Sequence, residues 1–87
     1  MNKNFYDCEN NKKKIIEDIN EKFFYGIMAP SWYIYIDLWF RKYGFDNQVM
    51  ISLFNYCYER CAMHQNYIQE VAKEWAENNI KTLKDLD

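Results

Sequence analysis

The chain has 87 residues, a mass of 10.8 kDa and a formal charge of −2, from 11 basic and 13 acidic residues. This length fits one small domain, and a hydrophobic fraction of 49% argues against a wholly disordered chain. With only 2 Gly and 1 Pro, the turn-rich sandwiches and small barrels are disfavoured, so an all-α fold is predicted. The net negative charge does not indicate a domain whose main task is to bind a phosphate backbone. Such binding would need a local basic patch.

The first predicted helix follows a polar segment. Residues 1–11 are rich in Asn and Lys and lack hydrophobic periodicity, so they are predicted to form a flexible lead-in or linker. A helix is predicted from about Lys12 to Tyr25, with Asn10 or Asn11 as its cap and Gly26 as a left-handed stop. Its apolar stripe consists of Ile15, Ile19 and Phe23.

Turn and capping residues delimit the next two predicted helices. Proline is favoured at the first helical position, so the second helix is predicted from Pro30 to Gly44. Apolar residues surround it almost completely, which is typical of a central helix or of one shared with a partner. Asp46 is a good N-cap for a third helix. The residues of that helix predicted to face the core are Val49, Met50, Leu53, Phe54, Cys57 and Cys61.

The last part of the sequence predicts a fourth helix and a short extra segment. Asn66 followed by Gln69 resembles a capping box, and Asn78–Asn79 can end the helix. Thr82 with Asp85 resembles another cap, so a short C-terminal helical segment is expected there. The inward stripe of the fourth helix is Ile68, Val71, Ala72 and Trp75. The predicted fold is therefore a compact bundle of four main helices plus the short C-terminal segment.

The sequence contains no motif typical of an enzyme or of cofactor binding, so a non-enzymatic protein is predicted. Cys57, Cys61 and His64 are spaced so that a continuous helix would align them, and with Cys8 they could bind zinc. The favoured alternative is that Cys57 and Cys61 are small core residues. The odd number of cysteines, the polar N-terminus and the absence of a long apolar run predict a cytoplasmic protein without a membrane span.

The aromatic content predicts contacts with other molecules. The 6 Phe, 8 Tyr and 3 Trp are more rings than so small an interior can enclose, especially around the second helix. Some rings must therefore be exposed. They could form the contact of a homo-oligomer built on the second or the N-terminal helix, or they could be scattered tyrosines with no partner.

Residues late in the chain form the candidate interface. Tyr67, Val71 and Trp75 recur at every fourth position, a pattern typical of packing but also of a ring available to stack on a base. Lys73, Lys81 and Lys84 lie near them and form either a solvated face or a phosphate-binding patch.

The stretches APSWYIYIDLWFRKYGFD and NYIQEVAKEWAENNIKTLKDL resemble the DnaD domain of bacterial and phage replication-initiation proteins. The family's late signature reads here as Tyr67, Val71 and Trp75 followed by Asn79, Ile80, Lys81 and Thr82, with Val71 in place of isoleucine and Asn79 in place of a common glycine. The resemblance covers residues 12–87, which are interpreted as one DnaD-like helical domain.

The resemblance implies an accessory module of primosome assembly in DNA replication initiation. Such a module binds single-stranded or duplex DNA, here weakly on its own, and other initiation proteins. The alternative is a protein-interaction or oligomerisation domain without autonomous DNA binding. The candidate nucleic-acid-binding residues are Tyr67, Lys73, Trp75, Lys81, Thr82 and Lys84.

Overall fold

The computed structural model describes the backbone of residues 3–82 and the side chains of residues 12–82. Within these residues the chain forms four helices and no strand, which confirms the predicted all-α fold. The helices are α1 (Lys3–Phe24), α2 (Pro30–Tyr43), α3 (Asn47–Glu59) and α4 (Gln65–Glu77).

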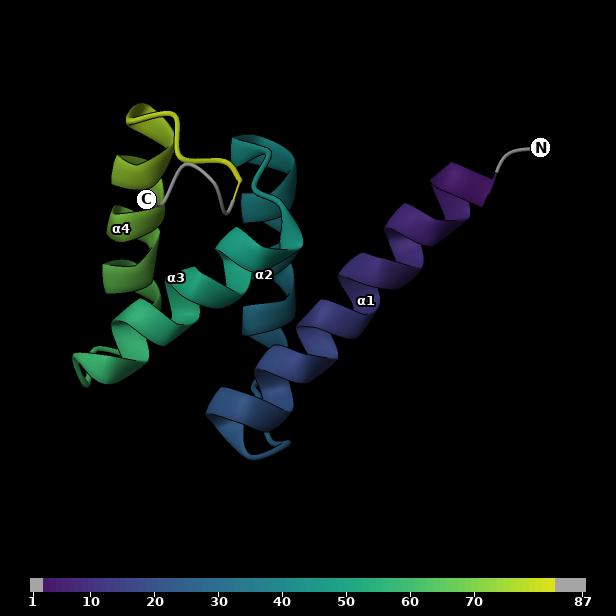
Figure 1. Ribbon diagram of the computed structural model, residues 1–87. Coiled ribbons are helices and arrows are strands. Elements are labelled where there is room, and N and C mark those ends of the chain that lie inside the picture. The colour runs from purple at the N-terminus through teal and green to yellow at the C-terminus, as the bar shows by residue number, and fades with distance from the viewer. Residues whose placement is uncertain (1–2, 83–87) are drawn as a thin grey trace.

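The four helices form two crossed pairs (Figure 1). α1 and α3 lie side by side, and the N-terminal part of α1 reaches beyond the other helices. α2 and α4 also lie side by side and run in the same direction. The Gln65 side-chain nitrogen donates to the Ser31 hydroxyl at 2.8 Å, which joins the N-terminal ends of this second pair.

α1 begins at Lys3, so the prediction that this helix begins at about Lys12 is wrong. The apolar stripe used for the prediction starts only where α1 meets the core, at Ile15. Residues 3–11 contain neither Pro nor Gly, so nothing in the local sequence ends the helix before that point. The division of the chain into 1–11 and 12–87 stays a prediction.

The predicted stop after the first helix is confirmed, one residue earlier than expected. α1 ends at Phe24, and Tyr25 and Gly26 adopt φ values of 57° and 83°. The Gly26 N–H donates to the carbonyl of Asn20 at 3.0 Å. Glycine adopts such a left-handed conformation without the steric cost that a Cβ imposes, so it suits this turn.

Both ends of α2 and the start of α3 follow their predicted caps. Pro30 opens α2, and Gly44 closes it with φ 68°, donating its N–H to Phe40. The Asp46 carboxylate accepts the Val49 N–H at 2.8 Å and caps α3. Such a cap satisfies a backbone donor that the first helical turn leaves without a partner.

α3 lies at the centre of the core. The ring of Phe54 is fully buried and lies 5.8–6.1 Å from those of Phe23, Trp32 and Trp39, measured between centroids. The buried hydrophobic residues are Ile15, Ile19, Phe23, Met28, Trp32, Ile36, Trp39, Phe40, Phe45, Val49, Met50, Leu53, Phe54, Cys57, Ile68 and Ala72. These confirm the predicted stripe of α1 and the predicted core positions of α3 except Cys61.

Cys61 is exposed, so its predicted place in the core is wrong. α3 ends at Glu59, and Cys61 adopts the left-handed φ of 53°. Its N–H donates to Tyr58, and the Ala62 N–H donates to Cys57. This pair of bonds is a Schellman motif, which turns the chain away from the helix axis and carries Cys61 off the core face.

α4 begins at Gln65 with His64 as its N-cap, so the predicted capping box at Asn66 is wrong. The His64 carbonyl accepts the N–H of Ile68, which is fully buried. Packing of Ile68 therefore sets the start of α4, and tertiary contacts override the local capping signal. Asn79 ends the helix with φ 60°, as predicted.

The inward stripe of α4 is graded. Ile68 and Ala72 are fully buried, whereas Val71 and Trp75 are half-buried and pack against the edge of the core. The predicted short helix after Thr82 lies mostly outside the described residues.

The prediction that some rings remain exposed is confirmed, and among the described side chains every exposed ring of the Phe, Tyr and Trp residues belongs to a tyrosine. These residues are Tyr25, Tyr33, Tyr58 and Tyr67. The exposed apolar surface of α2 is instead mainly aliphatic, at Ile34 and Leu38. The buried rings of α2 lie on the side of the helix that faces the core. The opposite side stays uncovered, because α2 lies at the edge of the bundle.

Candidate nucleic-acid interface

The three positions of the late aromatic stripe do not share one environment. Tyr67 is 38% exposed, whereas Val71 and Trp75 are half-buried. The Trp75 ring meets the Tyr56 ring of α3 edge-on, with centroids 5.7 Å apart. Trp75 therefore helps to hold α4 against α3, and Tyr67 has the largest uncovered ring in this stripe.

Tyr67 borders an open hollow of about 440 Å³ that runs along α4 beside Tyr56. Three glutamates and one lysine of α4 also line it: Glu70, Lys73, Glu74 and Glu77. The carboxylates outnumber the ammonium group, so the hollow repels phosphate. We call it the acidic hollow.

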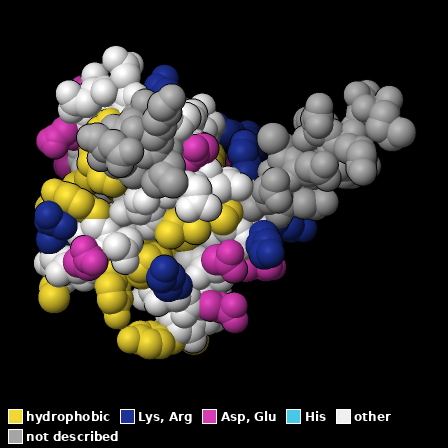
Figure 2. All heavy atoms as spheres, in the orientation of Figure 1, with side chains coloured by type: hydrophobic (Ala, Val, Ile, Leu, Met, Phe, Trp, Pro, Cys, Tyr) yellow, Lys and Arg dark blue, Asp and Glu magenta, His cyan; other side chains and the backbone are white. Residues whose placement is uncertain are grey.

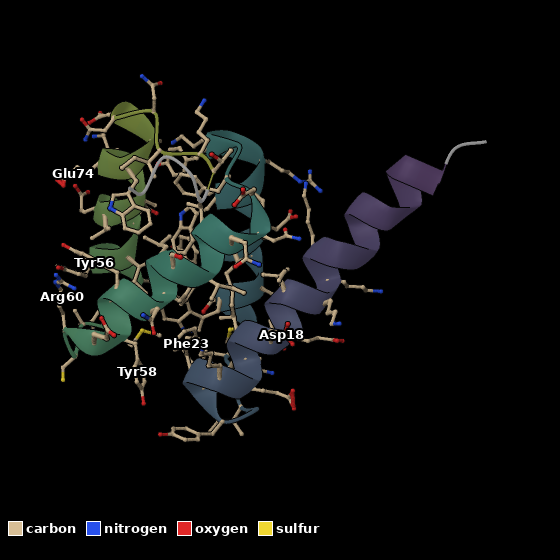
Figure 3. All side chains as sticks on the ribbon, viewed as in Figure 1. Asp18, Phe23, Tyr56, Tyr58, Arg60 and Glu74 are labelled. Carbon is tan, nitrogen blue, oxygen red and sulfur yellow. The ribbon has the colours of Figure 1, made fainter. Side chains whose placement is uncertain are left out.

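Arg60 lies on the same side of the molecule as Tyr56 and Glu74 (Figure 3). Its guanidinium carbon is 3.6 Å from the centroid of the Tyr56 ring, and Nη1 donates to the Tyr56 carbonyl at 3.1 Å. This cation–π contact holds the Arg60 side chain against α3.

A second hollow, of about 300 Å³, lies between the C-terminal ends of α2 and α4. Lys42 and Tyr43 line it from α2, and Lys73, Ala76 and Glu77 line it from α4. The Lys42 ammonium nitrogen is 5.5 Å from the centroid of the Tyr43 ring. We call this site the α2–α4 hollow; its two lysines outnumber its single glutamate.

The chain after α4 returns to the end of the molecule near the α2–α4 hollow. The Lys81 carbonyl accepts the N–H of Asp46 at 2.9 Å, which fixes this segment at the start of α3. Phe45, next to Asp46, contacts the ring of Tyr43 with centroids 5.5 Å apart. The exposed side chain of Lys81 therefore starts from the same end of the bundle as Tyr43.

The structure separates the six predicted residues. Tyr67 and Lys73 both border the acidic hollow, and Trp75 packs against Tyr56. Lys73 also lines the α2–α4 hollow. Thr82 is exposed at the end of the described residues, and Lys84 lies outside them. Sequence reasoning missed Lys42 and Tyr43, because no local pattern connects α2 with α4. The only signal in the sequence was that a lysine, Lys42, directly precedes a tyrosine, Tyr43.

On the face that Figure 2 shows, charges of both signs are mixed. Lysine and arginine side chains lie among aspartate and glutamate there, without a large area of one sign. A cationic contact on this chain is therefore local, and affinity for a polyanion is expected to be modest.

The residues considered as zinc ligands have different environments. Cys57 is buried, Cys61 is exposed beyond the end of α3, and His64 is exposed at the N-cap of α4. Among the described residues no three His, Cys, Asp or Glu side chains gather into a metal-binding group. Burial raises the pKa of the Cys57 thiol to about 11, against an opposing effect of the Arg60 charge. Cys57 is therefore a protonated core residue at neutral pH.

Comparison with known proteins gives one match. A family model described as replication initiation and membrane attachment matches residues 16–87 of the chain. No curated protein and no solved structure matches. Among the described helices, none combines the length and the apolar character needed to cross a bilayer.

Proposed function

The chain belongs to the replication initiation and membrane attachment family, and we propose that this DnaD-like domain binds DNA and other initiation proteins without catalysing a reaction. The family supports a role in replication initiation. We infer that the chain itself binds DNA from the chemistry of its surface.

The observation that supports DNA binding is the α2–α4 hollow. Two lysines from separate helices, Lys42 and Lys73, meet at a hollow that also has Tyr43 and Ala76 in its lining. Ammonium groups neutralise phosphates and release condensed counterions, and apolar and aromatic surface between them accepts sugars and bases. Lys81 adds a third cation at the same end of the bundle.

The acidic hollow is the weaker candidate, although it contains the most exposed ring of the stripe. Glu70, Glu74 and Glu77 would face the phosphates of any strand that stacked a base on Tyr67. Like charges at such short range cost free energy, so we assign DNA to the neighbouring α2–α4 hollow, which shares only Lys73 and Glu77 with the acidic hollow. Lys73 borders both hollows, which makes it a key residue of the proposed contact.

The salt dependence of binding tests the proposal quantitatively. Three phosphate contacts, from Lys42, Lys73 and Lys81, predict a slope of log affinity against log salt of about −2.1 for single strands and −2.7 for duplexes. Fluorescence anisotropy of a labelled oligonucleotide between about 20 and 200 mM salt measures this slope. No binding by the unaltered chain at the lowest salt would contradict the proposal and favour the protein-interaction alternative.

A pair of matched variants tests the location. Lys42→Glu with Lys73→Glu reverses both charges at the α2–α4 hollow and is expected to abolish binding. Lys14→Glu with Lys22→Glu makes the same change in net charge at two exposed residues of α1 and is expected to weaken binding only slightly. Equal losses in both variants would show that total charge, and not the α2–α4 hollow, governs affinity.

A specific observation also supports the second candidate function, contact with protein. Ile27 and Ile34 are 83% and 71% exposed, and Leu38 is 45% exposed. Such aliphatic side chains gain nothing from water, so exposed groups of them often mark a protein contact.

A further inference from the structure

Three hollows of the surface join into one groove that crosses α3. The acidic hollow shares Tyr56 with a second hollow, of about 390 Å³. This second hollow shares Lys22 and Ile51 with a third, of about 450 Å³, which lies between α1 and α3. Asp18 and Glu74, which line the first and the last part of the groove, lie on the two sides of α3 (Figure 3). We call it the α3 groove.

The floor of the α3 groove is apolar and its walls are acidic. Four half-buried side chains at the edge of the core form the floor: Ile51, Tyr56, Val71 and Trp75. Six carboxylates line the groove, from Asp18, Glu21, Glu59, Glu70, Glu74 and Glu77. The cations are Lys22 and Lys73 in the lining, and Arg60 against the ring of Tyr56. The groove is therefore net negative, at its α1 end as well as at its α4 end.

We propose that the α3 groove binds a basic amphipathic segment of another protein, with apolar side chains on the floor and lysines or arginines against the carboxylates. This inference rests on the proposed binding of other initiation proteins and names the chemistry of the partner. Charge complementarity selects the occupant. A nucleic acid would bring phosphates against six carboxylates, and an acidic segment would meet the same repulsion.

The chain itself places a cation on the floor of the groove. The Arg60 guanidinium lies 3.6 Å from the centroid of the Tyr56 ring. Tyr67, which is 38% exposed, offers a second ring among the glutamates of α4. A cation held between an aromatic face and a carboxylate gains from both contacts, so lysines and arginines of a partner suit this lining.

The length of the α3 groove fits a short helix. α1 and α4 each pack against α3, so the groove spans two spacings between packed helices, roughly 16–20 Å. A helix rises about 1.5 Å per residue and covers this distance with about 11–13 residues. Such a helix has about three turns, with apolar residues on one face and basic residues beside them, which is a common form of peptide recognition.

Fluorescence anisotropy of labelled peptides tests the chemistry. The probe is an amphipathic peptide of about 14 residues made of leucine and lysine. We expect it to bind, and we expect two related peptides to bind at least about tenfold more weakly: one with glutamate for each lysine and one with alanine for each leucine. No binding of the leucine–lysine peptide overturns the proposal. Equal binding of the glutamate peptide overturns the charge argument, and equal binding of the alanine peptide overturns the role of the apolar floor.

Matched variants test the location. Glu21→Lys with Glu74→Lys reverses one charge in each half of the α3 groove and is expected to weaken binding of the leucine–lysine peptide at least about tenfold. Glu17→Lys with Asp37→Lys makes the same change in net charge at exposed residues outside the groove lining, and is expected to weaken it less than about threefold. Circular dichroism checks that both variants are folded. Equal losses overturn the assigned surface.

Amide NMR locates the leucine–lysine peptide on the unaltered chain without any substitution. We expect the largest shift changes at Ile51, Asn55 and Tyr56 of α3 and at Val71 of α4. Changes centred on α2 instead would overturn the α3 groove as the site. These titrations contain no DNA, so their failure leaves DNA binding at the α2–α4 hollow as proposed, and a failure of DNA binding leaves the α3 groove as proposed.

Discussion

Replacing Trp75 by alanine separates a structural role of this ring from a role in stacking on a base. Full burial of a tryptophan or phenylalanine is worth about 3–5 kcal/mol against alanine. Trp75 is half-buried and meets Tyr56 edge-on, so we expect Trp75→Ala to lower the free energy of unfolding by about 2 kcal/mol. For a domain of this size that corresponds to a melting temperature lower by about 8–16 °C.

The assay combines thermal melting, followed by circular dichroism at 222 nm, with DNA binding well below the melting temperature. We expect the folded fraction of Trp75→Ala to bind DNA as the unaltered chain does, because the ring does not line the α2–α4 hollow. Trp75→Phe keeps an aromatic edge for Tyr56 and is expected to recover at least half of the lost stability. Tyr67→Ala, which removes a more exposed ring of the same helix, is expected to cost under about 1 kcal/mol.

One result would refute this reasoning. If Trp75→Ala kept its melting temperature but lost DNA binding, the ring would be a contact residue and its packing against Tyr56 would be incidental. The same result would move the proposed interface from the α2–α4 hollow to the flank of α4 that faces α3.

Three further predictions concern the core and its caps. Phe54→Ala is expected to lower the free energy of unfolding by about 3–5 kcal/mol, a large part of the roughly 4–13 kcal/mol typical of a domain this long. A urea midpoint close to that of the unaltered chain would contradict the central place of Phe54. Asp46→Ala removes the acceptor for Val49 and is expected to cost about 1 kcal/mol in the same urea titration, whereas Asp46→Asn should cost much less. At pH 8 iodoacetamide should modify Cys61 and spare Cys57, as mass spectrometry would detect, since burial raises the pKa of the Cys57 thiol to about 11. Equal alkylation of both cysteines would contradict the burial of Cys57. Because its pKa lies above the 9.0 of an unperturbed thiol, the contribution of Cys57 to the free energy of unfolding is complete below pH 9 and falls as the pH rises through 11.

Local signals in the sequence determined the helix class and most helix ends. Pro30 restricts its φ angle at the start of α2, and Gly44 adopts a left-handed backbone at the end of that helix. The side chain of Asp46 caps α3. Each of these effects depends on only a few neighbouring residues. The periodic stripe of α1 and the core positions of α3 were predicted for the same reason, because helical spacing alone decides which side chains share a face. The late aromatic signature identified the family correctly.

Local signals failed where packing decided the result. The start of α4 follows from the burial of Ile68 and not from Asn66, and the Schellman turn at Cys61 ended α3 before its predicted last core residue. α1 extends to Lys3 because nothing in residues 3–11 stops a helix, although those residues have no apolar stripe. Here the difference in local free energy between alternatives is about 1 kcal/mol or less, which a few tertiary contacts exceed.

The candidate site depended most on tertiary structure. The sequence indicated Lys73 but could not connect it with Lys42, since side chains on different helices meet only through the parallel packing of α2 and α4. The packing of α4 against α3 turned Trp75 towards Tyr56, and the packing of α2 against the core left Ile34 and Leu38 exposed on its outer face. Sequence periodicity fixes which residues of one helix share a face, whereas the relative position of two helices depends on how all their side chains fill the space between them.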